Sequence, residues 1–233
     1  MDAVPAIDST EHWRSVLIYT ARAANNNEVF RDILRLYVPE GSAIADLTWG
    51  RGNFWVGIDR SKYKLVRLDK YAPCDVKADF RAVPLADESQ DAVVFDPPYV
   101  TRMGFKRRSK QNPNGSNQKF AFGLDASGPK NEREIDELYA AGTAEARRIL
   151  KRGGILILKT MDTQKRRHVE LANLTGFKLI DLFVVVTKGK PPSKPYAQKH
   201  ARKNHSYFMV FRKLRKPENW KKAAQKLASV YIQ

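Results

Sequence analysis

Residues 91–99 read Asp-Ala-Val-Val-Phe-Asp-Pro-Pro-Tyr, and the last four of them are the most informative about the chemistry of the chain. The apolar run before Asp96 predicts a fully buried strand. Proline has no N–H to donate, so Pro97-Pro98 ends strand pairing and imposes a rigid extended turn. A carboxylate, a backbone carbonyl and the ring of Tyr99 then meet at the carboxyl end of the strand, where open α/β sheets bind ligands. These groups suit a planar ring that carries an amine, such as adenine or cytosine.

Helices and strands alternate on both sides of this turn. We expect helices over residues 28–38, 132–150 and 164–174, and strands over 43–48, 64–68, 75–78, 155–158, 179–187 and 206–211. The alternation predicts a mainly parallel α/β sheet, and the last two strands predict an antiparallel hairpin at its edge. We expect the glycines of Lys151-Arg152-Gly153-Gly154 to end the second helix. Residues 218–232 predict a basic amphipathic helix.

A glycine turn and two acids follow the strands upstream of Asp96. The turn is Asp46-Leu47-Thr48-Trp49-Gly50-Arg51-Gly52, whose glycines allow close approach to a ligand. Asp69 lies 19 residues beyond Gly50 at a strand end, where a carboxylate can accept both ribose hydroxyls. Asp79 ends the next strand and is suited to an adenine amine beside that ribose. Each acid alone fits a solvated loop or a helix cap equally well. Asp46, Asp69 and Asp79 at successive strand ends, in this order, favour a nucleoside as the ligand.

Together these motifs resemble the S-adenosylmethionine-dependent DNA amino-methyltransferases, which modify adenine N6 or cytosine N4. The resemblance runs from about residue 15 to 213, and residues 144–154 and 204–212 are similar to later segments of that family. It implies a Rossmann-like class I methyltransferase fold with a mainly parallel seven-stranded sheet. It also implies S-adenosylmethionine as cofactor, with the binding residues Asp46, Thr48, Gly50, Gly52, Asp69 and Asp79. Trp49 and Arg51 depart from the family's usual pattern of smaller or more acidic residues.

The resemblance implies direct methyl transfer at Asp96, Pro97, Pro98 and Tyr99. An exocyclic amine is a poor nucleophile because its lone pair is delocalised into the ring. Hydrogen bonds to Asp96 and to the Pro97 carbonyl would turn that lone pair toward the methyl group, and Asp96 would stabilise the positive charge that develops. Tyr99 would stack on the base, and a base in a duplex would have to flip out.

Several readings of the target remain. Aspartate before Pro-Pro-Tyr is the more adenine-like version of the motif, so adenine N6 is favoured over cytosine N4. An RNA base amine is an alternative substrate, and a catalytically silent nucleic-acid-binding protein is an alternative class. The recognition sequence, the oligomeric state and the existence of a restriction partner stay open.

The charge of the chain predicts a polyanionic partner. The 233 residues carry a net charge of +17, with a pI near 10.0, which is typical of nucleic-acid-binding proteins. Residues 187–226 hold 13 lysines and arginines against one glutamate, and residues 100–134 hold eight against three acids. DNA is the expected partner. The candidate contacts are Arg102, Lys106, Arg107, Arg108, Lys188, Lys190, Lys194, Lys199, Arg202 and Lys203.

We expect residues 1–213 to form the catalytic domain and residues 214–233 a basic C-terminal helix. Within the domain, residues 100–130 are a candidate target-recognition loop and residues 187–205 a basic loop. Cys74 is the only cysteine and the four histidines lack metal-ligand spacing, so no metal is expected. No apolar run approaches 18 residues and no signal pattern opens the chain, so the cytoplasm is the expected location and no membrane contact is foreseen.

Overall fold

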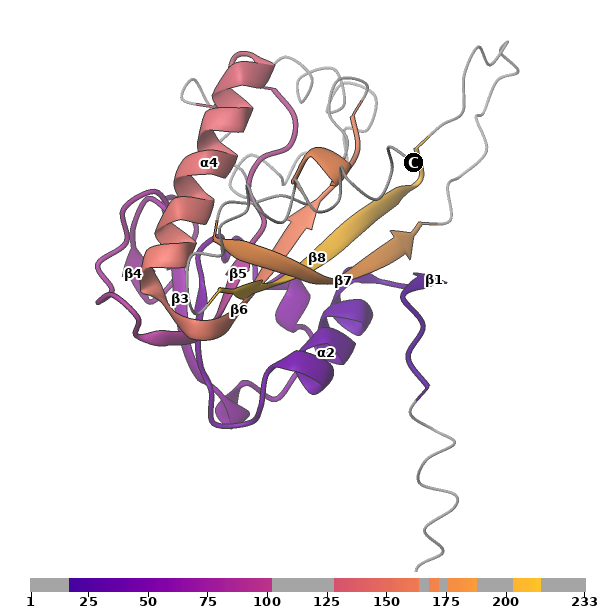
Figure 1. The fold of residues 1–233 in the computed structure, drawn as a ribbon, viewed down its shortest axis with the longest axis horizontal. Coiled ribbons are helices and arrows are strands. Elements are labelled where there is room, and N and C mark those ends of the chain that lie inside the picture. Colours follow the sequence, from indigo (N-terminus) through magenta and orange to yellow (C-terminus); the bar gives the residue numbers. More distant parts are fainter. Residues whose placement is uncertain (1–16, 102–127, 164–167, 172–175, 188–202, 215–233) are drawn as a thin grey trace, which may run out of the picture.

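The computed structural model describes residues 17–101, 128–163, 168–171, 176–187 and 203–214. These residues form one eight-stranded sheet in the order β1-β7-β8-β6-β5-β2-β3-β4 (Figure 1). Strand β8 is antiparallel to both of its neighbours, and every other neighbouring pair is parallel. The strands are β1 (Ala21–Ala23), β2 (Ala43–Asp46), β3 (Lys64–Asp69), β4 (Val76–Lys77), β5 (Gln90–Phe95), β6 (Leu150–Thr160), β7 (Phe177–Val186) and β8 (His205–Lys213).

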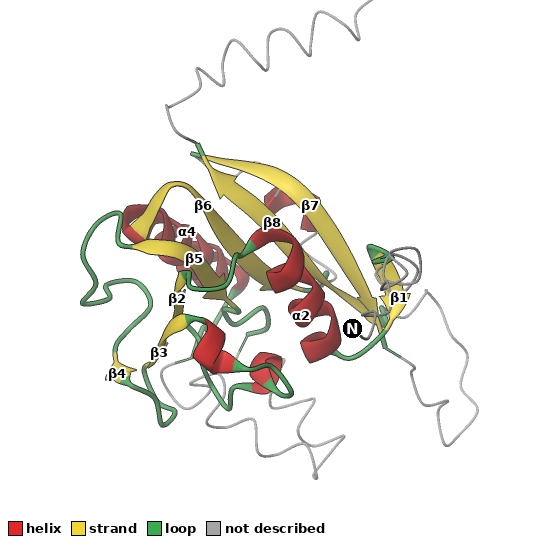
Figure 2. Ribbon diagram, turned by 90° about the horizontal axis from the view of Figure 1, so that it is seen from below, coloured by secondary structure: helices red, strands yellow, loops and turns green. Residues whose placement is uncertain are grey.

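Two α-helices cover opposite faces of the sheet, α2 (Asn26–Tyr37) and α4 (Glu132–Ile149) (Figure 2). Successive side chains of a strand point to opposite faces. Val93 and Phe95 therefore belong to the core cluster that includes Ile135 of α4. Ala92 and Val94 belong to the cluster that includes Phe30 of α2. Strand β5 is consequently buried on both faces, as the apolar run predicts.

An asparagine is the N-cap residue of both α2 and α4. The Oδ1 atom of Asn131 accepts a hydrogen bond from the Glu134 N–H at 2.9 Å, which caps the first turn of α4. The Asn25 N–H donates to Glu28 Oε2 at 3.2 Å at the start of α2. Gly142 lets α4 approach the sheet, because a Cβ there would lie 2.2 Å from the ring of Phe95.

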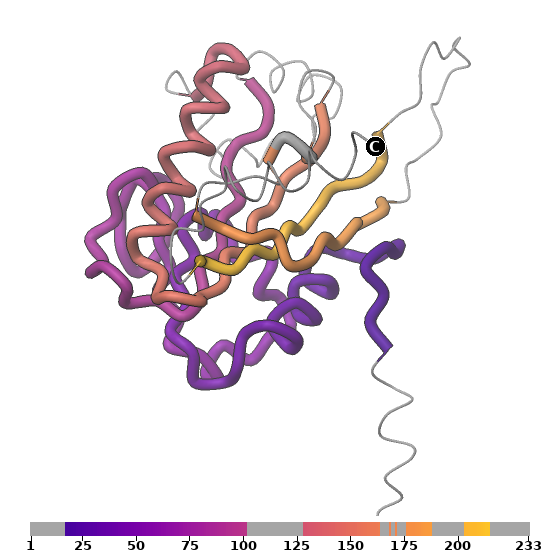
Figure 3. Tube along the Cα trace, viewed as in Figure 1, coloured from indigo at the N-terminus to yellow at the C-terminus, as the bar shows by residue number. Residues whose placement is uncertain are grey.

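The expected fold class is confirmed, with differences at the edge of the sheet. The sheet has one strand more than the seven expected, because residues 21–23 pair with β7 (Figure 3). The antiparallel pair β7–β8 is present, but β1 lies outside it, so the hairpin is not the edge. Residues 151–154 belong to β6 instead of ending a helix, since Leu150 already pairs with Gln90.

Short 3-10 helices connect the strands near the glycine turn. These are η1 (Asn53–Trp55) and η2 (Arg60–Lys62), and they take the place of a full helix between β2 and β3. Of the helix expected over residues 164–174, the described part is the 3-10 helix η4 (His168–Leu171). The expected C-terminal helix and the candidate target-recognition loop, apart from residues 100–101 and 128–130, lie outside the described residues. Within the part of the chain that is described, no helix is both long and apolar enough to cross a bilayer.

Candidate active site

The Asp96 turn and the glycine turn meet at the carboxyl ends of β5 and β2. The Asp96 N–H donates a hydrogen bond to Thr48 Oγ1 at 2.7 Å, which joins the two motifs directly. The backbone N–H of Asp96 is thus hydrogen-bonded, whereas its side-chain Oδ1 is buried and has no hydrogen-bond partner among the described residues. Burial raises the pKa of Asp96 to about 7, the positive charge of Lys159 opposes this rise, and the negative charge of Asp46 adds to it. A carboxylate oxygen that is buried without a partner at a strand end indicates a position where a ligand can donate a hydrogen bond.

Asp46, by contrast, has its hydrogen bonds within the chain. It is only 2% exposed, and it accepts hydrogen bonds from Trp55 Nε1–H at 2.9 Å and from the Thr48 N–H at 3.1 Å. Burial raises its pKa to about 7, and both hydrogen bonds oppose that rise. Asp46 therefore stabilises the glycine turn through these hydrogen bonds, and it is not among the residues that line the cavity described below.

The glycines of the turn adopt backbone conformations that other residues rarely take. Gly50 and Gly52 have φ angles of +56° and +68°, and a Cβ on Gly52 would lie 2.5 Å from the Trp49 ring. The indole of Trp49 packs on Trp55, and the guanidinium of Arg67 lies 5.3 Å from its ring centroid. The unusual tryptophan thus closes one side of the turn.

Asp69 is partly engaged by backbone groups. Its Oδ2 accepts from the Gly50 N–H at 2.8 Å, and its Oδ1 accepts from the N–H groups of Tyr71 and Ala72, both at 2.7 Å. A carboxylate offers about four acceptor positions, so about one remains. Asp69 can accept one ribose hydroxyl without losing a backbone partner, and accepting both would cost it one.

Asp79 is held by two cations. Arg81 donates to its two oxygens from Nε at 2.8 Å and from Nη2 at 2.7 Å, and Lys70 Nζ donates at 3.2 Å. These hydrogen bonds, led by that of Arg81, hold the pKa of Asp79 well below its usual range. A ligand amine would have to displace Lys70 or Arg81 to reach this carboxylate.

A cavity of about 340 Å³ joins these strand ends, a volume within the usual range of small-molecule sites. Of the predicted site residues, Thr48, Asp69, Asp79, Asp96 and Pro98 line it. Its walls also hold side chains that sequence reasoning did not single out: Leu47, Lys70, Tyr71, Phe80, Arg81, Glu134, Glu137, Leu138 and Ala141, together with Gly128 and Pro129.

The cavity fits a nucleoside-bearing cofactor. Asp69 retains an acceptor for a ribose hydroxyl, and Phe80 supplies an aromatic wall that packs edge-on against Phe95 at 5.1 Å between centroids. The buried free oxygen of Asp96 marks where a hydrogen-bond donor belongs. The position of Phe80 directly after Asp79 was the signal in the sequence that could have identified this wall.

The lining residues of this cavity do not include four other residues of the two motifs, Gly50, Gly52, Pro97 and Tyr99. The predicted nucleic-acid contacts lie outside the described residues except Lys203, an exposed side chain whose Nζ is 3.5 Å from Asp162 Oδ2.

The chain is similar to solved structures of methyltransferases. A 1,6-didemethyltoxoflavin-N1-methyltransferase from Burkholderia thailandensis, with bound 1,6-didemethyltoxoflavin and S-adenosylhomocysteine, matches with a TM-score of 0.53 and 12% identity over 89% of this chain and 83% of that chain. An S-adenosylmethionine-dependent methyltransferase from Methanosarcina mazei matches with a TM-score of 0.48 and 13% identity over 79% and 98%. No curated protein sequence matches the chain. At 12% identity the Burkholderia match shows the fold.

Fold and site thus define a Rossmann-like methyltransferase. A family model of N6 and N4 amino-methyltransferases, described as DNA methylase, matches residues 90–231. The chain belongs to this family, and S-adenosylmethionine is its cofactor. The match begins at the first residue of β5 and so includes the Asp96 turn.

Proposed function

We propose that this protein transfers a methyl group from S-adenosylmethionine to the N6 amine of adenine in DNA. The observation that carries the proposal is the free, buried Oδ1 of Asp96, at a Pro-Pro turn that opens into the cavity. A carboxylate in that position accepts a hydrogen bond from an amine. Membership of the DNA methylase family supports the reaction type.

The cofactor half of the cavity is assigned to Thr48, Asp69, Asp79 and Phe80. Asp69 would accept a ribose hydroxyl at its remaining lone pair, and Phe80 would pack on the adenine ring of the cofactor. Asp46 and Gly50 act indirectly, because they hold the turn and Asp69 in place. When bound, S-adenosylmethionine supplies an electrophilic methyl group on a sulfonium.

Asp96 and Pro97 are assigned to the target amine. Two hydrogen bonds, to an Asp96 oxygen and to the Pro97 carbonyl, would orient both N–H groups and turn the lone pair toward the methyl group. The carboxylate then stabilises the positive charge that develops on nitrogen. A carboxyl whose pKa lies at about 7 is also matched to accept the departing proton at neutral pH. Tyr99 would stack on the extruded base.

Adenine and DNA are the finer parts of the proposal. Asp rather than Ser before Pro-Pro-Tyr favours adenine, and the net charge of +17 favours a polyanion that holds the base. The predicted contacts in residues 102–108 directly follow the Asp96 turn in the chain, and those in residues 188–203 precede β8.

The test is to incubate the protein with labelled cofactor and with unmodified DNA or RNA, then to identify the methylated nucleoside by mass spectrometry. We expect N6-methyldeoxyadenosine. N4-methyldeoxycytidine would contradict the choice of base, and label found in RNA alone would contradict the choice of polymer. Cofactor binding without transfer to either polymer would contradict catalysis and favour a silent nucleic-acid-binding protein.

A further inference from the structure

A buried lysine lies beside the Asp96 turn. Lys159, near the carboxyl end of β6, follows the apolar run 155–158 and is only 4% exposed. Its Nζ donates a hydrogen bond to Ser206 Oγ at 2.6 Å and lies 4.3 Å from the ring centroid of Phe208, both on the neighbouring strand β8. Within the described residues no carboxylate forms a direct ion pair with it.

Strand register places Lys159 next to the Asp96 turn. Phe95 of β5 is the register partner of Leu158 of β6, so Asp96 and Lys159 each come one residue later on neighbouring parallel strands. The two side chains interact electrostatically, each acting on the other. Lys159 is thus a buried positive charge on the strand next to Asp96, whose Oδ1 is unpartnered.

Such a charge is costly to bury. An ammonium without a contacting carboxylate loses its hydration, and one hydroxyl and one aromatic face replace only part of it. Burial accordingly lowers the pKa of Lys159 to about 8, and the negative charge of Asp96 opposes that fall. An apolar residue would fill this strand position at less cost, so packing alone does not account for the lysine.

We propose that Lys159 is a positioning residue that holds Asp96 as an anion in its desolvated site, ready to accept the hydrogens of the target amine. The assignment of the amine rests on the proposed function. The effect on Asp96 itself does not, because it is a property of the chain without substrate.

The other charged groups around Asp96 either disfavour its ionisation or are already paired with another residue. Asp46 of β2 is negative and disfavours ionisation of Asp96, and Asp69 of β3 acts in the same sense on Asp46. Across the cavity, α4 contributes two further acids, Glu134 and Glu137.

The cavity cations Lys70 and Arg81 are bound to Asp79, so neither serves as the partner of Asp96. Lys159 is the one cation that acts on Asp96 among the described residues.

The direct test is the titration of Asp96 in the 233-residue chain by NMR of carboxyl-labelled aspartate, with the Asp96 signal assigned through Asp96→Asn. We expect Lys159→Met to raise the midpoint of Asp96 by about 1 to 3 pH units, the effect of removing a nearby opposite charge. Lys151→Met is the matched control, because Lys151 lies on the same strand but pairs with Asp91 at the surface. In Lys151→Met the titration midpoint of Asp96 should equal that of the wild-type protein.

An unchanged Asp96 midpoint in folded Lys159→Met would overturn the proposal. If this variant does not fold, the wild-type protein decides the question by NMR of labelled lysine Cε. Lys159 must stay protonated across the pH range in which Asp96 loses its proton, and a Lys159 already neutral in that range would overturn the proposal.

The rate of methyl transfer supplies a second readout. The acidic limb of the kcat profile should move to higher pH in Lys159→Met by the same amount as the NMR midpoint, whereas a merely structural role would lower kcat uniformly without moving the limb. If the wild-type enzyme transfers no methyl group to any nucleic acid, the proposed function fails while the NMR titration still decides the role of Lys159.

Discussion

Asp46 and Asp96 lie at the carboxyl ends of neighbouring strands and differ in their hydrogen-bond partners. Trp55 and Thr48 satisfy the carboxylate of Asp46, whereas the Oδ1 of Asp96 is unpartnered. In sequence the two acids look alike, since each follows an apolar strand. Their difference depends on an indole nine residues beyond Asp46, which the fold brings beneath the turn.

Trp55→Phe tests the structural role of Asp46. The variant keeps the aromatic packing and removes the N–H, so one oxygen of a buried carboxyl loses its donor. We expect a loss of about 1–3 kcal/mol in the free energy of unfolding, measured by urea denaturation. Tyr63→Phe, on a ring that packs edge-on against Trp55, is the control and should change stability by less than about 0.5 kcal/mol. Equal stability of the two variants would contradict this role.

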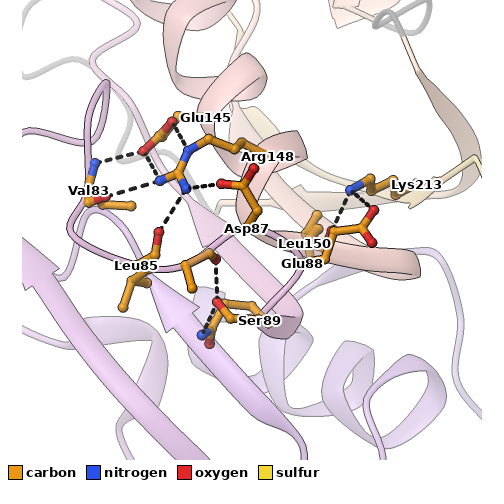
Figure 4. Close-up of polar contacts among 11 residues, drawn as sticks. Val83, Leu85, Asp87, Glu88, Ser89, Glu145, Arg148, Leu150 and Lys213 are labelled. Atoms are coloured by element: carbon orange, nitrogen blue, oxygen red, sulfur yellow. Dashed lines mark hydrogen bonds and ion pairs between the residues drawn. The ribbon is translucent and has the colours of Figure 1, made fainter.

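At the scale of elements, the segment between β4 and β5 is held by the last turns of α4 (Figure 4). Arg148 donates to the backbone carbonyls of Val83 at 3.1 Å and Leu85 at 2.8 Å, and Glu145 accepts from the Val83 N–H at 2.8 Å. The same segment carries Asp79, Phe80 and Arg81 into the cavity. Arg148 and Glu145, which we call the α4 clamp, therefore hold in place the segment that forms one wall of the cavity.

Arg148→Met should release this wall. Glu145 would keep its buried carboxylate and lose its guanidinium partner, so we expect a loss of about 1–3 kcal/mol in stability and a higher Kd for S-adenosylmethionine by calorimetry. Arg133→Met on the same helix is the control, because its exposed pair with Glu137 is worth well under about 1 kcal/mol. If cofactor affinity were as high in Arg148→Met as in Arg133→Met, the clamp would have no part in binding.

The elements with strong apolar periodicity were predictable from the sequence. Strands β2, β3 and β5 and helices α2 and α4 lie within about two residues of their expected bounds. The start of β6 was not predictable, because Lys151-Arg152-Gly153 is typical of a turn. Pairing of Leu150 with Gln90 overrides that local preference. Strand β1 is three residues long and has no pattern to recognise.

The sequence predicted those parts of the candidate site in which strand order alone brings residues together. Strand ends at one edge of a parallel sheet bring Thr48 and Asp96 into contact. The engagement of Asp79 by Arg81 and Lys70 depends on side-chain geometry that no spacing reveals. Lys159 did leave a signal, a charge that ends an apolar strand, but its meaning required the neighbour across the sheet.

At the scale of the whole molecule, the net charge of +17 is the dominant feature. Binding that neutralises phosphates releases counterions, so the logarithm of the affinity falls linearly with the logarithm of the salt concentration. We expect the affinity for DNA, measured by fluorescence anisotropy, to fall about a thousandfold between 50 and 200 mM salt if about six phosphates are contacted. Binding of S-adenosylmethionine, which carries little net charge, is the internal control and should change little. Salt-insensitive DNA binding would contradict an electrostatic footprint.

In the proposed reaction the Asp96 carboxylate promotes methyl transfer and does not bind the cofactor. Single-turnover transfer to adenine-containing DNA should fall by about 10²–10³-fold or more in Asp96→Asn, because the charge that stabilises the transition state is gone. The Kd for S-adenosylmethionine should remain close to that of the wild type. Asp91→Asn, at the opposite end of the same strand, should transfer at the wild-type rate. Wild-type transfer by Asp96→Asn would contradict the account.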